Sequence, residues 1–163
     1  MDIKKLADVK DRFADYEKIF NSGDYDKAAD ILSAILERIE ECTDERKTGA
    51  MDDTFVKNRT WTVRPIYISL NHVMEYYVLS HVISNHETDV LCTELPVGEY
   101  YRTYGGLCLK LSKFRRAEDA FKKAICWNPV DLDSYLGLAE CYKNLNMLSR
   151  YLDVTKQAYR FCC

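Results

Sequence analysis

The sequence predicts an all-α protein: stacked helical hairpins, about seven helices, forming a single domain over residues 1–163. Apolar residues recur at helical spacing through most of the chain, and short turn signals separate the helical segments. The last part of the chain also repeats itself at a lag of about 34 residues. The 47% apolar composition, with only six Gly and three Pro, suits a buried helical core and excludes a disordered or collagen-like chain.

The first hairpin is predicted over residues 1–41. Apolar positions three and four apart run from Leu6 to Phe20 and again from Tyr25 to Ile39. Between these runs, Gly23 tolerates the left-handed backbone that ends a helix, and Asp24 can accept hydrogen bonds from the first free amides of the next helix. The two runs are therefore expected to fold back on each other.

The middle of the chain is predicted to hold one long helix between two connections. Residues 42–64 lose the periodicity and gain charge, so a long connection is expected, with Thr60–Val63 able to pair briefly as a strand. Pro65 suits a helical first turn, because its missing N–H costs nothing there. A helix from Pro65 to about Ser84, followed by a linker to residue 97, would place on one broad face Ile66, Leu70, Val73, Met74, Tyr77, Val78 and Val82.

Two further hairpins are predicted at residues 98–131 and 132–163. The lag of about 34 residues aligns Tyr101 with Tyr135 and Ala124 with Ala158. Pro129 ends one helix, and Asp131 can cap the next. Small residues at such positions let helices approach closely, whereas a generic helical bundle would explain the amphipathic pattern but not the shared lag.

These residues resemble the tetratricopeptide repeat family. The family pattern is read here as Tyr101, Tyr104-Gly105, Cys108, Phe114, Ala117, Phe121, Ala124 and Asn128-Pro129. Tyr104 and Cys108 depart from the family residues, and the second copy replaces two residues of its second helix with Tyr151 and Thr155. Good matches cover the last 66 residues, and weaker ones cover roughly the first forty. The resemblance implies a right-handed α-α superhelix whose first helices line a concave surface.

The sequence carries no pattern that indicates catalysis, a cofactor or a metal. The seven Cys are an odd number without a Cys-x-x-Cys pair, which favours reduced thiols in an intracellular chain. The spacing of His72, His81 and His86 does not bring two imidazoles together on adjacent helical turns. We therefore expect a protein that is not an enzyme and has no cofactor or metal site.

The resemblance implies a groove for a protein or peptide partner. Carried over by position, its lining residues are Glu99, Arg102, Thr103, Gly106, Leu109 and Lys110 from one repeat, and Asp133, Leu136, Gly137, Glu140, Lys143 and Asn144 from the next. Their cations would pair with acidic groups of the partner, and their leucines would accept an apolar anchor. The Lys-Asn clamp of some family members is replaced by Arg102 and Gly106, which argues against their particular ligands.

Two alternative functions remain open from the sequence. Residues 1–97 hold 12 basic and 19 acidic side chains, whereas residues 98–163 hold 11 and 7. The protein could therefore be a regulatory or nucleic-acid-associated subunit whose basic second half faces phosphates through Lys110, Lys113, Arg115, Arg116, Lys122 and Lys123. The interruption of this cluster by acids favours a solvated helix face instead. The last helix has no polar capping helix after it, so some apolar surface is expected to stay uncovered at Tyr142, Tyr151, Val154, Ala158 and Tyr159. Either the natural protein continues with more repeats, or this end packs on another copy, as an oligomerisation module, or on a partner. No targeting or membrane-spanning segment is recognised, which favours the cytoplasm.

Overall fold

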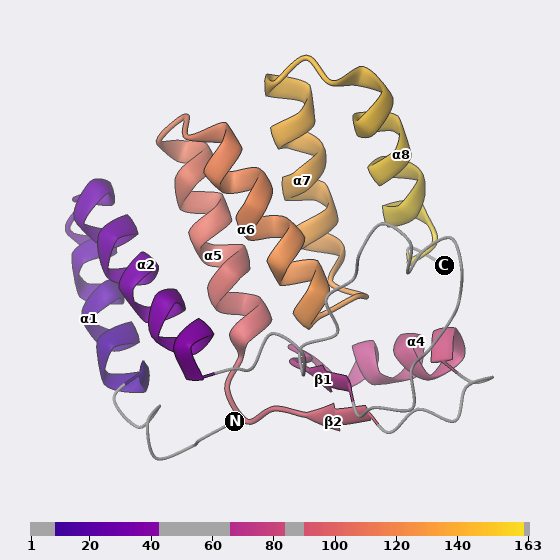
Figure 1. Ribbon diagram of the computed structural model, residues 1–163, viewed down its shortest axis with the longest axis horizontal. Helices are drawn as coiled ribbons and strands as arrows, with labels where there is room; N and C mark the ends of the chain where they lie inside the picture. The colour runs from indigo at the N-terminus through magenta and orange to yellow at the C-terminus, as the bar shows by residue number, and fades with distance from the viewer. Residues whose placement is uncertain (1–8, 43–65, 84–89, 162–163) are drawn as a thin grey trace.

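The computed structural model describes residues 9–42, 66–83 and 90–161, which form seven helices and two short strands (Figure 1). The elements are α1 (Val9–Asn21), α2 (Tyr25–Cys42), β1 (Ile66–Ile68), α4 (Val73–Ile83), β2 (Val90–Cys92), α5 (Val97–Lys110), α6 (Phe114–Trp127), α7 (Leu132–Asn144) and α8 (Leu148–Tyr159). The described part of the chain is predominantly helical, which confirms the predicted all-α class.

Six of the helices form three hairpins that pack in chain order. The pairs are α1 with α2, α5 with α6, and α7 with α8; α2 packs on α5, and α6 packs on α7 (Figure 1). In the first turn, Gly23 has a φ of +86°, and the Asp24 carboxylate accepts a hydrogen bond from the Lys27 amide at 3.2 Å. The stop and cap expected there are both present.

The second and third hairpins use the same turn. Ser112 and Asn146, 34 positions apart in the chain, have left-handed φ values of 56° and 57°. After each, an amide returns to the first helix at 2.8 Å, from Lys113 to the Cys108 carbonyl and from Met147 to the Tyr142 carbonyl. The 34-residue repeat seen in the sequence is therefore also present in the backbone conformation of these two turns.

The small residues of these hairpins lie where helices approach closely. Ala117 and Ala124 are fully buried. The ring of Phe121 lies between two glycines, because a Cβ on Gly105 would come within 2.9 Å of the ring and one on Gly137 within 2.3 Å. A Cβ at either position would thus displace the end of the Phe121 ring, which joins two consecutive hairpins.

The prediction of one long helix starting at Pro65 is wrong for its first part. Ile66–Ile68 is strand β1, paired in parallel with Val90–Cys92 of β2, and α4 begins only at Val73. The intervening backbone is bonded elsewhere, since the Ser69 amide donates to the Trp127 carbonyl at 2.8 Å. The stretch predicted as a linker after the helix accordingly contains a strand. Pro65 itself, Thr60–Val63 and the rest of the 42–64 connection beyond Cys42 lie outside the described residues.

The β1–α4 segment packs against the ends of the C-terminal hairpins. Ile68, Leu79 and Val130 form a small buried cluster, and Phe161 packs against it. The buried Ser69 hydroxyl donates to the Leu95 carbonyl at 3.2 Å. The segment is thus held by both apolar packing and polar contacts, near the ends of α6, α7 and α8 (Figure 1).

The C-terminal helix is less open than the sequence suggests. Tyr142, Val154 and Ala158 are buried between α7 and α8, and Tyr151 is half-buried. Of the five residues expected to leave an uncovered surface, only Tyr159 is largely exposed, at 71%. The reason is that α8 turns these residues toward its own hairpin partner rather than away from it.

Candidate partner-binding surface

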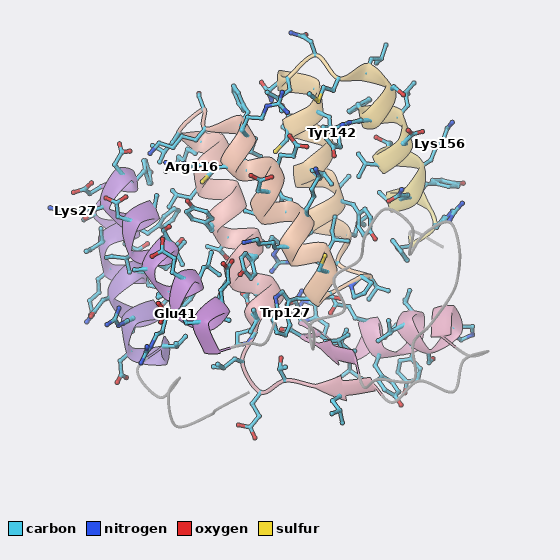
Figure 2. All side chains as sticks on the ribbon, viewed as in Figure 1. Lys27, Glu41, Arg116, Trp127, Tyr142 and Lys156 are labelled. Atoms are coloured by element: carbon cyan, nitrogen blue, oxygen red, sulfur yellow. The ribbon has the colours of Figure 1, made fainter. Side chains whose placement is uncertain are left out.

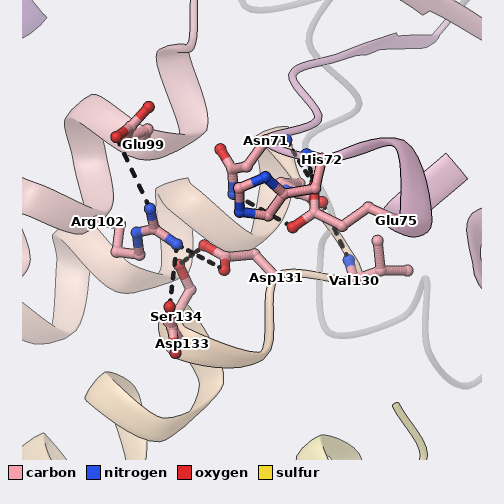
Figure 3. A network of polar contacts seen from close by, with 10 residues as sticks. Asn71, His72, Glu75, Glu99, Arg102, Val130, Asp131, Asp133 and Ser134 are labelled. Atoms are coloured by element: carbon pink, nitrogen blue, oxygen red, sulfur yellow. Dashed lines mark hydrogen bonds and ion pairs between the residues drawn. The ribbon is translucent and has the colours of Figure 1, made fainter. Parts of the chain in front are cut away.

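A cluster of charged residues joins the predicted groove residues of α5 to the start of α7. The Arg102 guanidinium contacts Asp131 at 3.1 Å, Asp133 at 3.2 Å and Glu99 at 3.9 Å (Figure 3). Arg102 is mostly buried, with 24% of its side chain exposed. It therefore ties two consecutive first helices together within the chain.

Asp131 precedes α7 as predicted, but its side chain makes no capping bond to the helix amides. Its carboxylate instead accepts a hydrogen bond from the Ser134 hydroxyl at 2.6 Å and pairs with Arg102. Burial raises the pKa of Asp131 above its ordinary value, although Ser134 and Arg102 favour the ionised form. The predicted cap residue is thus the buried centre of a cross-helix ion pair.

The exposed face of α7 carries one apolar side chain between charges. Leu136 is 51% exposed, and the Asp133 side chain is 72% exposed. Further along, Lys143 pairs with Glu140 at 3.1 Å, and the Asn144 amide donates to the Glu140 carbonyl at 2.8 Å. These five groove positions of α7 therefore share one face, and its only Lys, Lys143, already pairs with a carboxylate of the same helix.

The other predicted groove residues are divided between surface and core. The Lys110 ammonium lies 3.8 Å from the ring centroid of Tyr25, so it contacts the first hairpin. Leu109 packs against the core of the second and third hairpins, and Gly137 lies against Phe121. Thr103 is half-buried and Gly106 is exposed. Glu99, Asp133, Leu136 and Glu140 remain as exposed or partly exposed groups near Arg102 and along α7.

The basic residues of the second half are largely engaged by neighbouring groups. Lys113 pairs with Asp26 at 2.8 Å, and Lys123 pairs with Glu40. Lys122 and Arg115 both contact the buried Glu118, at 2.8 and 3.1 Å. Burial by itself would raise the pKa of Glu118, but the hydrogen bonds and charges of its two cations outweigh burial and lower it. This positive cluster is thus partly neutralised inside the fold.

Sequence reasoning missed the polar contact between α4 and the inter-repeat turn. The Asn128 side-chain amide is fully buried and donates to the Glu75 carboxylate at 2.9 Å. The same carboxylate accepts the backbone amides of Asn71 at 2.6 Å and His72 at 3.3 Å, as in a capping box. The Asn-Pro pair signals a turn, but no local pattern identifies Glu75 as its partner.

The described residues offer little that indicates a reaction centre. Cys108 and Cys141 are buried, and burial raises the pKa of the Cys141 thiol to about 12, so both act as small apolar groups. Across residues 9–42, 66–83 and 90–161, no set of three His, Cys, Asp or Glu residues is arranged to hold a metal ion. None of the helices in these same ranges combines the length and apolar character needed to cross a membrane.

The fold and this surface define a helical protein of packed hairpins with a polar face across two first helices. Comparison with family models, curated proteins and solved structures finds no match. The likeness to tetratricopeptide repeats therefore remains a prediction from the residues.

Proposed function

We propose that this protein is a non-catalytic scaffold of the tetratricopeptide type, which binds a peptide or partner helix on its α5–α7 surface. The observation that carries the proposal is the Arg102 cluster, which fixes α5 to α7 and leaves an exposed leucine beside it. Rigid, aligned first helices favour binding of an extended segment, because little order has to be gained on association. The proposal includes a right-handed superhelical arrangement and a cytoplasmic location.

The surface suits a partner that brings an apolar side chain and a positive charge. Leu136 offers apolar area, while Asp133, Glu99 and Glu140 are 72, 44 and 47% exposed. The nearby cations, Arg102 and Lys143, already have carboxylate partners in the chain. Three carboxylates, Glu99, Asp131 and Asp133, share the single cation Arg102, so the cluster keeps an excess of negative charge. A partner with an apolar anchor for Leu136 and a Lys or Arg near the exposed Asp133 would complement this surface.

The ion pairs of α6 favour this proposal over binding to nucleic acid. Lys113 and Lys123 reach carboxylates of α2, and Lys122 reaches Glu118. Binding phosphates through these lysines would require breaking pairs that hold neighbouring helices together.

The proposal is tested by placing a charge on the proposed anchor site. The wild-type protein is used to recover a partner, which is then purified and titrated with Leu136→Glu and Leu152→Glu. The two leucines are matched, since both lie on helices and are 51 and 48% exposed. Leu136→Glu should weaken binding roughly tenfold or more, as expected for loss of an apolar anchor. Leu152→Glu, on α8, should leave it unchanged; equal affinities for both variants would place the site elsewhere.

A further inference from the structure

The β1–α4 segment holds the turn that joins α6 to α7. Trp127, at the end of α6 nearest to β1 and α4, accepts a hydrogen bond from the Ser69 amide at 2.8 Å (Figure 2). Val130, inside the turn, packs against Ile68 of β1 and Leu79 of α4. These contacts all come from one segment, so the position of the turn depends on whether that segment is docked.

Asn128 links α4 to the turn through both its side chain and its backbone. Its buried side-chain amide donates to the Glu75 carboxylate at 2.9 Å. Its side-chain carbonyl accepts a hydrogen bond from the Val130 amide at 3.4 Å, and its backbone carbonyl accepts one from the Asp131 amide at 3.2 Å. Asp131 also pairs with Arg102 of α5 at 3.1 Å. A continuous series of polar contacts therefore runs from α4 to the α5–α7 surface.

The charged groups along this series act on one another. The Glu75 carboxylate accepts its hydrogen bonds from neutral amides, whereas the Asp131 carboxylate pairs with the Arg102 guanidinium. Burial is the largest cause that raises the pKa of Asp131, and the negative charges of Glu75 and Asp133 raise it further, while Ser134 and Arg102 oppose the shift. The ionised carboxylates of Glu75 and Asp131 therefore repel each other, and Arg102 compensates this repulsion.

We propose that the β1–α4 segment regulates the α5–α7 surface, because α4 docks firmly only while a positive charge compensates Asp131. The regulatory part of this inference rests on the proposed function of the surface. Asp131 and Asp133 contact the same nitrogen of Arg102, so a partner that brings a Lys or Arg to Asp133 also favours the docked segment. Coupling between two sites is reciprocal, so the docked segment favours the partner by the same factor.

The coupling inside the chain is tested by amide hydrogen exchange of residues 73–83 in the full chain without a partner. Arg102→Met leaves Asp131 uncompensated, so exchange in this helix should speed up about fivefold or more, the lower end of typical coupling. Asp131→Asn removes the repulsion but can still accept a bond from Ser134, so exchange should slow severalfold. In the double variant, the second substitution should restore most of the protection lost through the first. Damage to the fold cannot produce this restoration.

Lys113→Met is the matched control for Arg102→Met. Lys113 also joins neighbouring hairpins through a carboxylate, Asp26 of α2, at 2.8 Å, but it lies beyond the far end of α5. It should leave exchange in residues 73–83 unchanged, and equal effects of Arg102→Met and Lys113→Met would overturn the inference. Faster exchange in Asp131→Asn would overturn it too, since loss of the ion pair alone would then explain both variants.

The regulatory part is tested with the partner recovered for the Leu136 experiment. Glu75→Ala removes the bond from α4 to Asn128 and should raise the dissociation constant of that partner about fivefold or more. The exposed Glu94, mutated to Ala, should leave it unchanged. Unchanged affinity in Glu75→Ala would overturn the regulation, whereas Leu136→Glu decides separately whether the surface binds. The exchange measurements need no partner, so the coupling and the proposed function can fail independently.

Discussion

At the scale of single residues, the C-terminal hairpins depend on how closely their backbones approach. Phe121 fills the space left by Gly105 and Gly137, and its own side chain is 3% exposed. A ring in this position buries a large apolar area while it fixes the distance between three helices. Substitutions that add one carbon here should therefore have effects out of proportion to their size.

Gly137→Ala is expected to destabilise the protein by about 1–3 kcal/mol, the usual cost of overpacking. The added Cβ would lie 2.3 Å from the end of the Phe121 ring. Gly106→Ala is the control, because its Cβ would have nothing within 4 Å and the change should stabilise the helix by up to ~1 kcal/mol. The free energy of unfolding in urea measures both variants, and equal values would contradict the packing argument.

Glu118→Gln should make stability less sensitive to acid. The pKa of Glu118 is lowered in the folded protein, so its contribution is present above its ordinary value of 4.5 and is lost as the pH falls through the folded value. The difference in unfolding free energy between wild type and variant should therefore narrow below about pH 4.5.

Asp131→Asn should change the pH dependence of stability in the opposite direction to Glu118→Gln. The pKa of Asp131 is raised by burial, so protonation of the wild-type carboxyl favours the folded state as the pH falls. The wild type should then gain stability relative to this variant in acid. The check is the free energy of unfolding of each variant, measured relative to the wild type as a function of pH. If this difference changed with pH in the same way for both variants, the two carboxyls would not differ in environment.

At the scale of secondary structure elements, the β1–α4 segment is held to the hairpins by few contacts. Glu75 accepts bonds from the start of α4 and from Asn128, while Ser69 bonds to Trp127. The same carboxylate therefore begins the helix and fixes it to the turn before α7. One residue controls both local structure and docking.

Glu75→Ala should release β1 and α4 while the three hairpins stay folded. It removes the bond to the buried Asn128 amide, which costs about 1–3 kcal/mol when a buried donor loses its partner. Amide hydrogen exchange should speed up in residues 73–83 and remain slow in α5 to α7. The exposed Glu94, mutated to Ala, serves as the control and should leave exchange as it is. Uniformly faster exchange would instead mean that the segment and the hairpins unfold together.

At the scale of the whole molecule, the three hairpins pack in a row in which contacts between neighbours predominate. The α5–α7 surface spans two neighbouring hairpins of this row, because Arg102 of the second hairpin pairs with Asp131 and Asp133 of the third.

The predicted parts of the fold are those encoded by residues close together in the chain. The lag between Tyr101 and Tyr135, the stop at Gly23 and the cap at Asp24 are local signals, and the structure contains the corresponding features. Strand β1 was not predicted, because three residues are too few for a clear alternation and their partner strand begins 24 positions further on. The charge of the candidate surface also depends on long-range contacts. Nothing near Arg102 in the sequence indicates that its guanidinium forms ion pairs with Asp131 and Asp133.

The left-handed residues at Ser112 and Asn146 have a consequence for how this chain can change in length. Because the turns at Ser112 and Asn146 have the same backbone conformation, a second copy of residues 114–147 could be inserted after Met147. Every later helix would then keep the same side toward its neighbour. Loss of a single residue within α6 or α7 would instead rotate all that follows by about 100° and turn buried side chains outward. Growth by whole units is thus tolerated by the architecture, whereas growth by fractions of a unit is not.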